Sequence, residues 1–567
     1  MELEGTVKRG AFGRTVAMRS ATAAIERFRR EERGSLVIFG LFIFCSMLVL
    51  AGVAVDLMRF EERRTLLQNT VDRASLAAAS LQQTLPPKQV VIDYFTKAGL
   101  TPPSEDDITV VDGPNNTSRS VTVNVSETMP TWFMKIAGVE TLGAPARSTA
   151  EESVGQLEIS LVLDVSGSMA GSRINKLKPA AKNFVDKIFD SSEPGKVSIS
   201  IIPYATQVAL PDNMMSYLNV TQEHTFSNCI EFSQAAGDFD TPALSFGTGP
   251  FSRVYKRNGH FDPWGYSPYY DDASPPESYR NCPTASARKI MPFSEDRNAL
   301  KNYIEGLEAY GNTSIDIGVK WGAALLDPSL KPMVHSMAGA GQLSNNMDGR
   351  PFTYGNGETL KILVVMTDGE NTTEYRLQPD VDHGQSLLVR NKWYRENNSS
   401  SDDTSVYQYS LWDAQRGKYW VFAKRQWRST PWGNQSGDSG YSGSPQAVPM
   451  SWPEVWDTMS IRYFSDVLVA NVSGNNWRSS DWRPGSNSET TTYISSQKDS
   501  RTLDICDAAK SASSRLRIYT IAFEAPRAGE RLLNSCQNAG FYAVEGLDIN
   551  KAFEGIVNSI NKLRLTH

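Results

Sequence analysis

One uninterrupted apolar run, Leu36–Val55, constrains this chain more than any other feature. Its twenty residues, LVIFGLFIFCSMLVLAGVAV, contain no charged side chain. As a helix that rises 1.5 Å per residue, the run would span about 30 Å, which matches the hydrocarbon thickness of a bilayer. The alternative is a cleaved signal peptide, but the apolar part of such a peptide has only about 7–15 residues and is followed by a small-residue cleavage site. We therefore expect a retained transmembrane helix at 34–57.

The charges on the two sides of the run predict its orientation. Four arginines crowd its N-terminal side, whereas the charges on its C-terminal side are balanced; the four are Arg27, Arg29, Arg30 and Arg33. The positive-inside rule then keeps a basic head, 1–33, in the cytoplasm and exports the rest of the chain. The predicted location is the bacterial inner membrane, crossed once, with the bulk of the chain in the periplasm.

Composition excludes several classes of protein. The chain has 567 residues, of which 40% are hydrophobic, so it can form two or more domains with real cores and is neither a small disulfide scaffold nor a disordered tail. The head carries a net charge of +3 and the remainder −9. Because only the short head is basic, nucleic acid is not an expected partner.

Five cysteines are consistent with an exported location. Cys45 lies inside the apolar run and is expected to be an inert apolar side chain. The other four, an even number in the exported part, indicate disulfides; they are Cys229, Cys282, Cys506 and Cys536. Four cysteines allow three pairings, of which we favour the sequential one, Cys229 with Cys282 and Cys506 with Cys536.

Helix-forming residues continue beyond the run without a breaker and predict a helical extension at 58–87, ended by Pro86-Pro87. Apolar residues recur along it at helical spacing and form one stripe: Leu66, Leu67, Val71, Ala74, Ala78 and Leu81. The stripe packs either on the next domain of the chain or on another membrane protein. A helical segment and alternating strands, separated by a turn cluster, then predict a small α/β domain at 88–153.

From residue 154 on, strand and helix signals alternate, as in a parallel sheet covered by helices on both faces. The expected strands are Leu157–Leu163, Val197–Tyr204, Leu360–Thr367 and Arg517–Phe523. The expected helices are Ile174–Phe189, Glu295–Leu307 with Ser294 as its cap, Ile315–Leu326, Leu503–Ser513, Gly529–Cys536 and Asp548–Leu563. Two long stretches, 211–293 and 371–501, interrupt this alternation. Without them about 200 residues of 154–567 remain, a usual domain size, so both are interpreted as insertions.

Polar residues follow the expected strands at the edge where ligands of open α/β sheets bind. Asp164-Val165-Ser166-Gly167-Ser168 follows the first strand, Thr367-Asp368-Gly369 ends the most apolar one, and Gly311-Asn312-Thr313 precedes a helix. Their carboxylate and hydroxyl oxygens suit Mg²⁺, Mn²⁺ or Ca²⁺ and do not suit zinc. A cation with few carboxylate ligands keeps positive charge and an open position, so it can bind an acidic group of a partner. Helix capping and turn formation are the alternative roles of these residues.

Together these three segments resemble the metal-ion-dependent adhesion site of von Willebrand factor A domains. The resemblance covers most of 155–567 apart from the insertions and implies a doubly wound, mostly parallel sheet. It also implies five metal ligands, direct or through water: Asp164, Ser166, Ser168, Thr313 and Asp368. Mg²⁺ is the first cofactor expected, with Mn²⁺ and Ca²⁺ as alternatives, and the expected partner is a protein that offers an acidic group to the metal.

The N-terminal part is similar to TadE/TadG-like proteins of tight-adherence (Flp) pilus assembly. The residues that carry this resemblance are Arg33-Gly34-Ser35, Ala54-Val55-Asp56, Arg59, Leu66, Leu67, Gln68, Asp72 and Ala74–Ala79. Prepilin-like members have Glu at the fifth position after the glycine, where this chain has Phe39, so we expect permanent anchoring rather than processing. Family members also tend to carry a cysteine before the last strand and another after it, which implies the pairing of Cys506 with Cys536.

Two further features are ambiguous. Gly437-Asp438-Ser439-Gly440 resembles the nucleophile loop of trypsin-like proteases, but no histidine stands in a context typical of the required base, so a solvated loop is favoured and no enzyme is expected. A hydrolase with its cleft in the insertions is the weakest alternative. Nine of the twelve tryptophans lie in 371–501. They form either a glycan- or peptide-binding surface or a small core of the insertion itself.

The sequence therefore predicts a membrane-anchored, exported protein of Flp/Tad pilus assembly or surface adhesion that binds protein partners through a metal-ion-dependent adhesion site. Other pilus assembly or envelope proteins are the expected partners, with the membrane bound through one helix. The alternative is a structural envelope scaffold or anchor in which the metal site only stabilises the sheet edge.

Overall fold

The computed structural model describes residues 33–80, 83–112, 118–153, 155–245, 247, 252–263, 279–355, 359–397, 406–472 and 490–564. The chain divides into two compact units, 1–153 and 154–567. Apart from Arg33, the predicted basic head lies outside the described residues.

The first unit begins with one continuous helix, α2 (Arg33–Ala79), which contains the whole apolar run. The large side chains of the run are exposed, with Leu36 at 75% and Phe42 at 69%. Among the described residues, α2 is the one helix long and apolar enough to cross a membrane. The expected apolar N-terminal helix is thus confirmed. It ends at Ala79, before the predicted end at 87, and the next helix, α3 (Pro87–Lys97), has Pro87 in its first turn, where proline's missing N–H costs no hydrogen bond.

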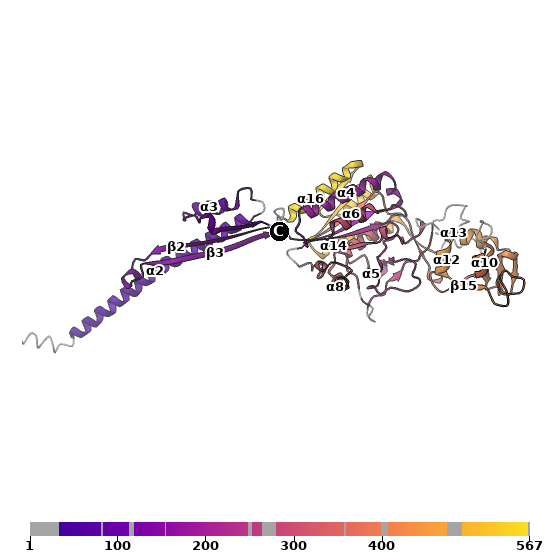
Figure 1. Cartoon of the computed structure of the whole chain (residues 1–567), viewed down its shortest axis with the longest axis horizontal. Coiled ribbons are helices and arrows are strands. Elements are labelled where there is room, and N and C mark those ends of the chain that lie inside the picture. The colour runs from indigo at the N-terminus through magenta and orange to yellow at the C-terminus, as the bar shows by residue number, and fades with distance from the viewer. Residues whose placement is uncertain are drawn as a thin grey trace, which may run out of the picture. The chain divides into compact units, whose positions relative to one another are not determined.

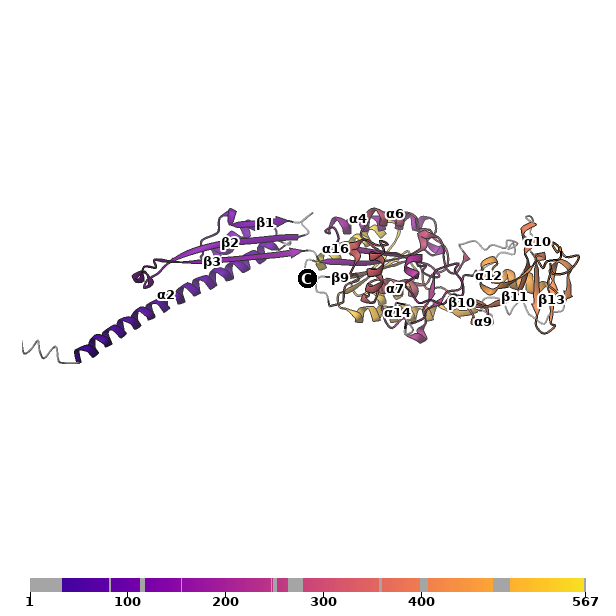
Figure 2. The same ribbon diagram turned by 60° about the horizontal axis from the view of Figure 1, so that its bottom comes forward.

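The C-terminal half of α2 packs on a three-stranded antiparallel sheet of β1 (Ile108–Asp112), β2 (Ser118–Pro130) and β3 (Thr141–Ser153), as Figure 1 and Figure 2 show together. The helix stripe, α3 and the sheet share one core, which includes Leu67, Val71, Ala74, Ala78, Val91, Phe95, Val121 and Val123. The stripe therefore packs on its own chain. Of its predicted members, Leu66 is 43% exposed and Leu81 lies outside the described residues.

The second unit is built on a six-stranded sheet in the order β18-β17-β9-β4-β5-β8. The strands are β4 (Gln156–Asp164), β5 (Val197–Tyr204), β8 (Met291–Ser294), β9 (Thr359–Thr367), β17 (Leu516–Phe523) and β18 (Gly540–Val544). All neighbours are parallel except β5 and β8, which are antiparallel. Strands β4 and β9 lie at the centre and are buried on both faces, which explains why they are continuous apolar runs rather than alternating ones.

Helices cover both faces of this sheet, as Figure 2 shows. One face is covered by α4 (Ser172–Asp190), α6 (Arg297–Glu305) and α16 (Ile549–Arg564), and the other by α7 (Ile315–Ala324), α14 (Ser495–Ala512) and α15 (Arg527–Cys536). Successive residues of β4 enter opposite cores: Leu161 packs with α4, and Val162 packs with α7. The predicted α/β class is confirmed, and the carboxyl ends of β4 and β9 meet at one edge of the sheet.

Some predicted boundaries are wrong. Helix α6 begins at Arg297, and its N-cap is Asp296 rather than Ser294, because the Asp296 carboxylate accepts the N–H groups of Asn298 and Ala299. Helix α14 begins at Ser495 rather than Leu503. Because β8 and the first turns of α14 belong to the sheet domain, both predicted insertions extend too far toward the C-terminus.

Most of the second predicted insertion forms a separate lobe with a five-stranded antiparallel sheet in the order β14-β13-β12-β11-β15. Its strands are β11 (Gln385–Asn391), β12 (Tyr409–Asp413), β13 (Lys418–Val421), β14 (Gln426–Arg428) and β15 (Ala447–Ser451). Trp420, Trp452 and Trp456 are buried in its core, and Trp456 of α12 (Trp452–Thr458) donates from Nε1 to the carbonyl of Val381 at 2.6 Å. These tryptophans therefore serve as a core of this lobe. Trp477 and Trp482 lie outside the described residues.

Short elements complete the second unit. Two-stranded ladders join β10 (Glu374–Leu377) with β16 (Thr490–Tyr493) and β6 (Ile230–Glu231) with β7 (Lys256–Arg257). The remaining α-helices of the described part of this unit are α5 (Asp212–Met215), α8 (Lys331–Gly339), α9 (Pro379–Asp382), α10 (Lys392–Asn397) and α13 (Ile461–Tyr463).

The predicted disulfides are confirmed. Cys229 pairs with Cys282 and Cys506 with Cys536, with Cα–Cα distances of 5.9 and 5.2 Å. The first closes a loop within 211–290, and the second links α14 to α15. Cys45 is a free, exposed thiol within the apolar run.

Candidate functional site

The candidate site begins at the end of β4, where Asp164 is buried in the middle of the sheet edge. Its Oδ1 accepts the backbone N–H of Ser166 at 2.8 Å, and its Oδ2 accepts the hydroxyl of Thr367, the last residue of β9, at 2.6 Å. Burial, with the nearby charge of Asp368 acting in the same direction, raises the pKa of Asp164 to about 6. The carboxylate is thus held by two strands and lies close to a second negative charge.

A chain of hydrogen bonds connects the D-x-S-x-S segment to the T-D-G segment. The hydroxyls of Ser166 and Ser168 are 3.0 Å apart, and Ser168 donates to Oδ1 of Asp368 at 2.7 Å. Asp164, Ser166 and Asp368 are buried, whereas Ser168 is exposed. Four of the five predicted ligands therefore form one cluster that opens to solvent at Ser168.

Thr313, the fifth predicted ligand, lies beside the same cluster. A Cβ added to Gly369 would lie 3.8 Å from the Thr313 hydroxyl and 3.9 Å from the Ser168 hydroxyl, so both hydroxyls border the space next to Gly369. The loop of Thr313 is tied to the chain after β9, because Thr313 and Thr372 exchange hydrogen bonds: Thr313 N–H to the Thr372 hydroxyl at 2.9 Å, and Thr372 N–H to the Thr313 carbonyl at 3.0 Å.

Arg173 is a member of this site that the sequence analysis missed. From the first turn of α4 it donates to Oδ2 of Asp368 at 2.7 Å and to Glu524 at 2.9 Å. Glu524 follows β17 and also accepts from Lys176 at 3.2 Å. Its hydrogen bond with Arg173 is the main reason that the pKa of the Glu524 carboxyl is lowered. The position of Arg173, five residues after Ser168 in the sequence, was a signal that the sequence offered.

Lys498 is the second residue that was missed. It is fully buried in α14, and its ammonium donates to the Thr313 carbonyl at 2.9 Å, the Ser314 hydroxyl at 2.6 Å and the Thr372 carbonyl at 2.8 Å. Burial lowers the pKa of Lys498, and the nearby carboxylates of Asp316 and Glu374 act in the opposite direction. Lys498 is thus a positioning residue that holds the loop of Thr313.

The donor set fits a hard divalent cation. It offers two carboxylates and three hydroxyls, all oxygen, which suits Mg²⁺, Mn²⁺ or Ca²⁺. The described residues contain no group of three or more His, Cys, Asp and Glu side chains arranged to hold a metal. A cation at this edge would therefore depend on the serine and threonine hydroxyls and on water for most of its coordination.

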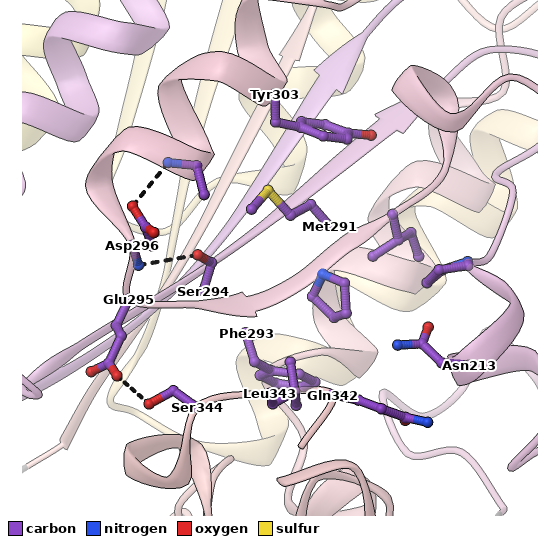
Figure 3. A pocket seen from close by; sticks show the side chains of 14 residues that line it. Asn213, Met291, Phe293, Ser294, Glu295, Asp296, Tyr303, Gln342, Leu343 and Ser344 are labelled. Carbon is purple, nitrogen blue, oxygen red and sulfur yellow. Dashed lines mark hydrogen bonds between the residues drawn. The ribbon is translucent and has the colours of Figure 1, made fainter. Parts of the chain in front are cut away.

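A separate pocket of about 540 Å³ lies along the edge strand β8, as Figure 3 shows. Met291, Phe293 and Leu343 give it apolar walls, and Glu295 accepts a hydrogen bond from Ser344 at its rim. The described residues that line it include none of the five predicted ligands. It is therefore distinct from the site at the carboxyl edge.

The protease-like segment 437–440 has a structural role. Asp438 is buried and forms a paired salt bridge with Arg428 at 2.9 and 3.2 Å, and it accepts the N–H of Gly433 at 2.9 Å. The carbonyl of Ser439 accepts from Asn391 at 3.0 Å. Asp438 thus closes a turn of the lobe rather than orienting a catalytic base.

Comparison with known proteins gives one family match. Residues 34–81 match the family described as "Putative Flp pilus-assembly TadE/G-like". The match covers the apolar run and the stripe of α2, so the resemblance expected from the sequence is confirmed for that segment. No curated protein matches the chain.

Several solved structures are similar to the chain at low identity. The von Willebrand factor domain of the type V pili tip protein Mfa5 from Porphyromonas gingivalis is 12% identical, with 72% of this chain and 96% of that chain covered and a TM-score of 0.28. The adhesive tip pilin GBS104 from Group B Streptococcus agalactiae is 11% identical, with coverages of 71% and 100% and a TM-score of 0.27. The pilus adhesin RrgA from Streptococcus pneumoniae is 10% identical, with coverages of 80% and 48% and a TM-score of 0.29.

Proposed function

We propose that this chain is a membrane-anchored protein of Flp/Tad pilus assembly or surface adhesion, and that it binds a protein partner through a divalent cation at the carboxyl edge of its six-stranded sheet. Mg²⁺ is the first candidate for the cation, with Mn²⁺ and Ca²⁺ as alternatives. The partner would be another pilus assembly or envelope protein that presents a carboxylate.

The observation that carries the proposal is the convergence of three distant segments at one point. Asp164, Ser168 and Asp368 belong to one hydrogen-bonded cluster, although Ser168 and Asp368 are 200 positions apart in the chain. Thr313 borders the same cluster across Gly369. Two buried carboxylates so close together favour a positive charge between them, since like charges in a buried site repel strongly.

Each residue has a defined part in this proposal. Asp164 and Asp368 would hold the cation directly or through water, and the hydroxyls of Ser166, Ser168 and Thr313 would complete its oxygen ligands. The bound cation supplies positive charge and an open position for an acidic group. Because Ser168 is exposed, a partner carboxylate would approach from the solvent side of that residue.

The membrane anchor in this proposal is α2. Its apolar run is long enough to span a bilayer, and the family match covers the same residues. With arginines before the run, the head would lie in the cytoplasm and the remainder in the periplasm of a bacterial inner membrane.

The test uses the purified full chain in detergent. Titration with Mn²⁺ or Mg²⁺ should give saturable binding in a calorimeter, and Asp164→Asn should abolish it. Crosslinking in intact cells from an engineered residue near Ser168 should capture a protein partner in a way that a chelator prevents. If the wild-type chain binds neither cation, the proposal is wrong.

One observation favours the scaffold alternative. Arg173 already neutralises Asp368 and ties α4 to the strand end at Glu524, so chain residues alone brace the edge. The two functions differ in the outcome of Asp368→Ala. Under the adhesion function the variant folds but loses partner capture, whereas under the scaffold function it loses stability and any partner capture is unchanged.

A further inference from the structure

The tip of the β2–β3 hairpin, residues 131–140, is an apolar surface that the cation site does not use. It follows β2 at Pro130 and precedes β3 at Thr141. Four of its large apolar side chains are exposed: Trp132 at 60%, Phe133 at 43%, Ile136 at 77% and Val139 at 37%. Such a concentration within one short loop is unusual for a surface that faces only water.

The hairpin tip is fixed to α2 at the end of the apolar run. The buried carboxylate of Asp56 accepts three successive backbone N–H groups, those of Trp132 at 3.0 Å, Phe133 at 2.7 Å and Met134 at 2.8 Å. Bonds from a carboxylate to backbone N–H groups are among the stronger hydrogen bonds in proteins. The tip is therefore held in one place on the helix.

Two side-chain contacts reinforce this attachment. The ring of Phe133 covers Gly52, where an added Cβ would lie 2.6 Å from Phe133 Cγ, so only glycine permits the contact. The guanidinium of Arg59 lies 3.5 Å from the centre of the Trp132 ring, a cation–π contact. Gly52, Asp56 and Arg59 thus form the seat of the tip on α2.

The seat lies at the level where the apolar run ends. Gly52 belongs to the run, and Asp56 is the first charged residue after it. At 1.5 Å per residue the two are separated by only about 6 Å along the helix axis. If α2 crosses a bilayer along its apolar run, the tip therefore reaches the boundary between hydrocarbon and headgroups. Tryptophan is enriched at that boundary because its ring is apolar and its N–H is polar.

We propose that the hairpin tip is a second membrane contact, in which Trp132, Phe133, Ile136 and Val139 enter the lipid interface beside α2. This inference rests on the membrane anchor of the proposed function but not on the cation. Lys135, an exposed residue within the tip, provides a positive charge for lipid phosphates.

A fixed tip would also orient the first unit against the membrane. Strands β2 and β3 pair over their full length from Ser118–Ser153 to Pro130–Thr141, and Arg63 of α2 binds Glu127 near the tip at 2.7 Å. Helix, hairpin and tip are therefore linked at several points. A membrane contact at the tip would restrict the tilt of α2 in the bilayer and so the direction in which the hairpin leaves it.

The test measures the depth of single fluorescent labels in the full chain, reconstituted in phosphatidylcholine vesicles with or without a spin label on the lipid acyl chains. The native thiol of Cys45 reports the anchor, since the other cysteines are in disulfides. In a Cys45→Ser background, Ile136→Cys reports the tip. The matched control is Leu76→Cys, which is 70% exposed on α2 but far from the run.

The expected result is that lipid spin labels quench the fluorophores at Cys45 and at Ile136→Cys, whereas iodide in the aqueous phase quenches only the one at Leu76→Cys. The inference is overturned if Cys45 is quenched by lipid while Ile136→Cys responds to iodide like the control. Protection of Ile136→Cys from both quenchers also overturns it, because a protein or a second copy of the chain then covers the tip. If Cys45 itself is not quenched by lipid, the anchor of the proposed function has failed.

Discussion

Arg173 donates a hydrogen bond from Nη1 to Oδ2 of Asp368 at 2.7 Å, while Ser168 donates to Oδ1 of the same carboxylate at 2.7 Å. Both oxygens of Asp368 are thus engaged by donors of the chain itself. A cation that takes Oδ2 of Asp368 must compete with the Arg173 guanidinium. Since Glu524 also accepts from Arg173, the guanidinium keeps a partner when it is displaced.

We expect Arg173→Ala to strengthen cation binding. A hydrogen bond between charged groups is worth about 1.5–3 kcal/mol, and the lower end applies here because Arg173 is partly exposed, so the affinity for Mn²⁺ should rise about tenfold. Calorimetric titration of the full chain measures this change. Affinity that stays the same or falls would show that Arg173 does not compete with the cation.

Lys176→Ala is the control for this experiment. Lys176 lies near Arg173 on α4 and pairs with Glu524 at 3.2 Å rather than with Asp368. Its removal takes away the same unit of positive charge without freeing an oxygen of Asp368. An equal gain in affinity in this variant would mean that general electrostatics, and not direct competition, accounts for the effect.

Gly529→Ala should disturb the candidate site through the Asp368-Gly369 turn. In the first turns of α15, a Cβ at Gly529 would lie 2.2 Å from the carbonyl oxygen of Gly369, so the variant must push α15 or the Asp368-Gly369 turn away. Overpacking of this kind costs about 1–3 kcal/mol, and we also expect weaker Mn²⁺ binding. Urea denaturation and titration measure the two effects.

Gly339→Ala is the matched variant, because it also lies in a helix but its Cβ would meet nothing within 4 Å. It should not lower the free energy of unfolding, because alanine is a better helix former than glycine, and it should leave the affinity unchanged. Equal behaviour of the two alanine variants would contradict the close approach of Gly529 to Gly369.

The central sheet could be predicted because its strands are buried on both faces. Strands such as β4 and β9 have no solvent-facing positions, so their sequences are continuous apolar runs with clear ends. The outer strands β8 and β18 were missed for the opposite reason. β18 is only half-buried, and β8 contains Pro292, which is tolerated at a sheet edge.

That the candidate ligand residues lie together could also be predicted, since the three segments stand at strand and helix ends, whereas the residues that position them could not. Lys498 and Arg501 of α14 are buried, and pattern analysis assigns such residues to a solvated surface. Lys498 is buried because it donates to Thr313, Ser314 and Thr372, which are remote in sequence. Only the fold brings these acceptors together, which is why α14 was predicted to begin too late.

The disulfide between Cys506 and Cys536 should stabilise the second unit substantially. It joins α14 to α15 across a sequence separation of 30 residues. On the chain-entropy model, closing a loop of this size stabilises by about 4 kcal/mol, so the double variant Cys506→Ser/Cys536→Ser should lose about that much in urea denaturation. Cys45→Ser, which removes a free thiol, should leave the free energy of unfolding unchanged. A double variant as stable as Cys45→Ser would contradict the entropic argument.

Asp56→Asn should loosen the hairpin tip from α2 without unfolding the unit. The amide keeps the shape of the side chain but has one carbonyl oxygen in place of two carboxylate oxygens, and its NH₂ group faces a backbone donor. Exchange of the amide hydrogens of Trp132, Phe133 and Met134 should therefore become about tenfold faster or more, since each loses part of a charge-assisted hydrogen bond.

Asp72→Asn is the matched control, because Asp72 is also on α2 but accepts from Gln68 at an exposed position. Hydrogen–deuterium exchange with mass spectrometry resolves the tip peptide from the rest of β2 and β3. If Asp56→Asn and Asp72→Asn exchange alike at the tip, Asp56 does not hold it, and the proposed membrane contact loses its structural basis.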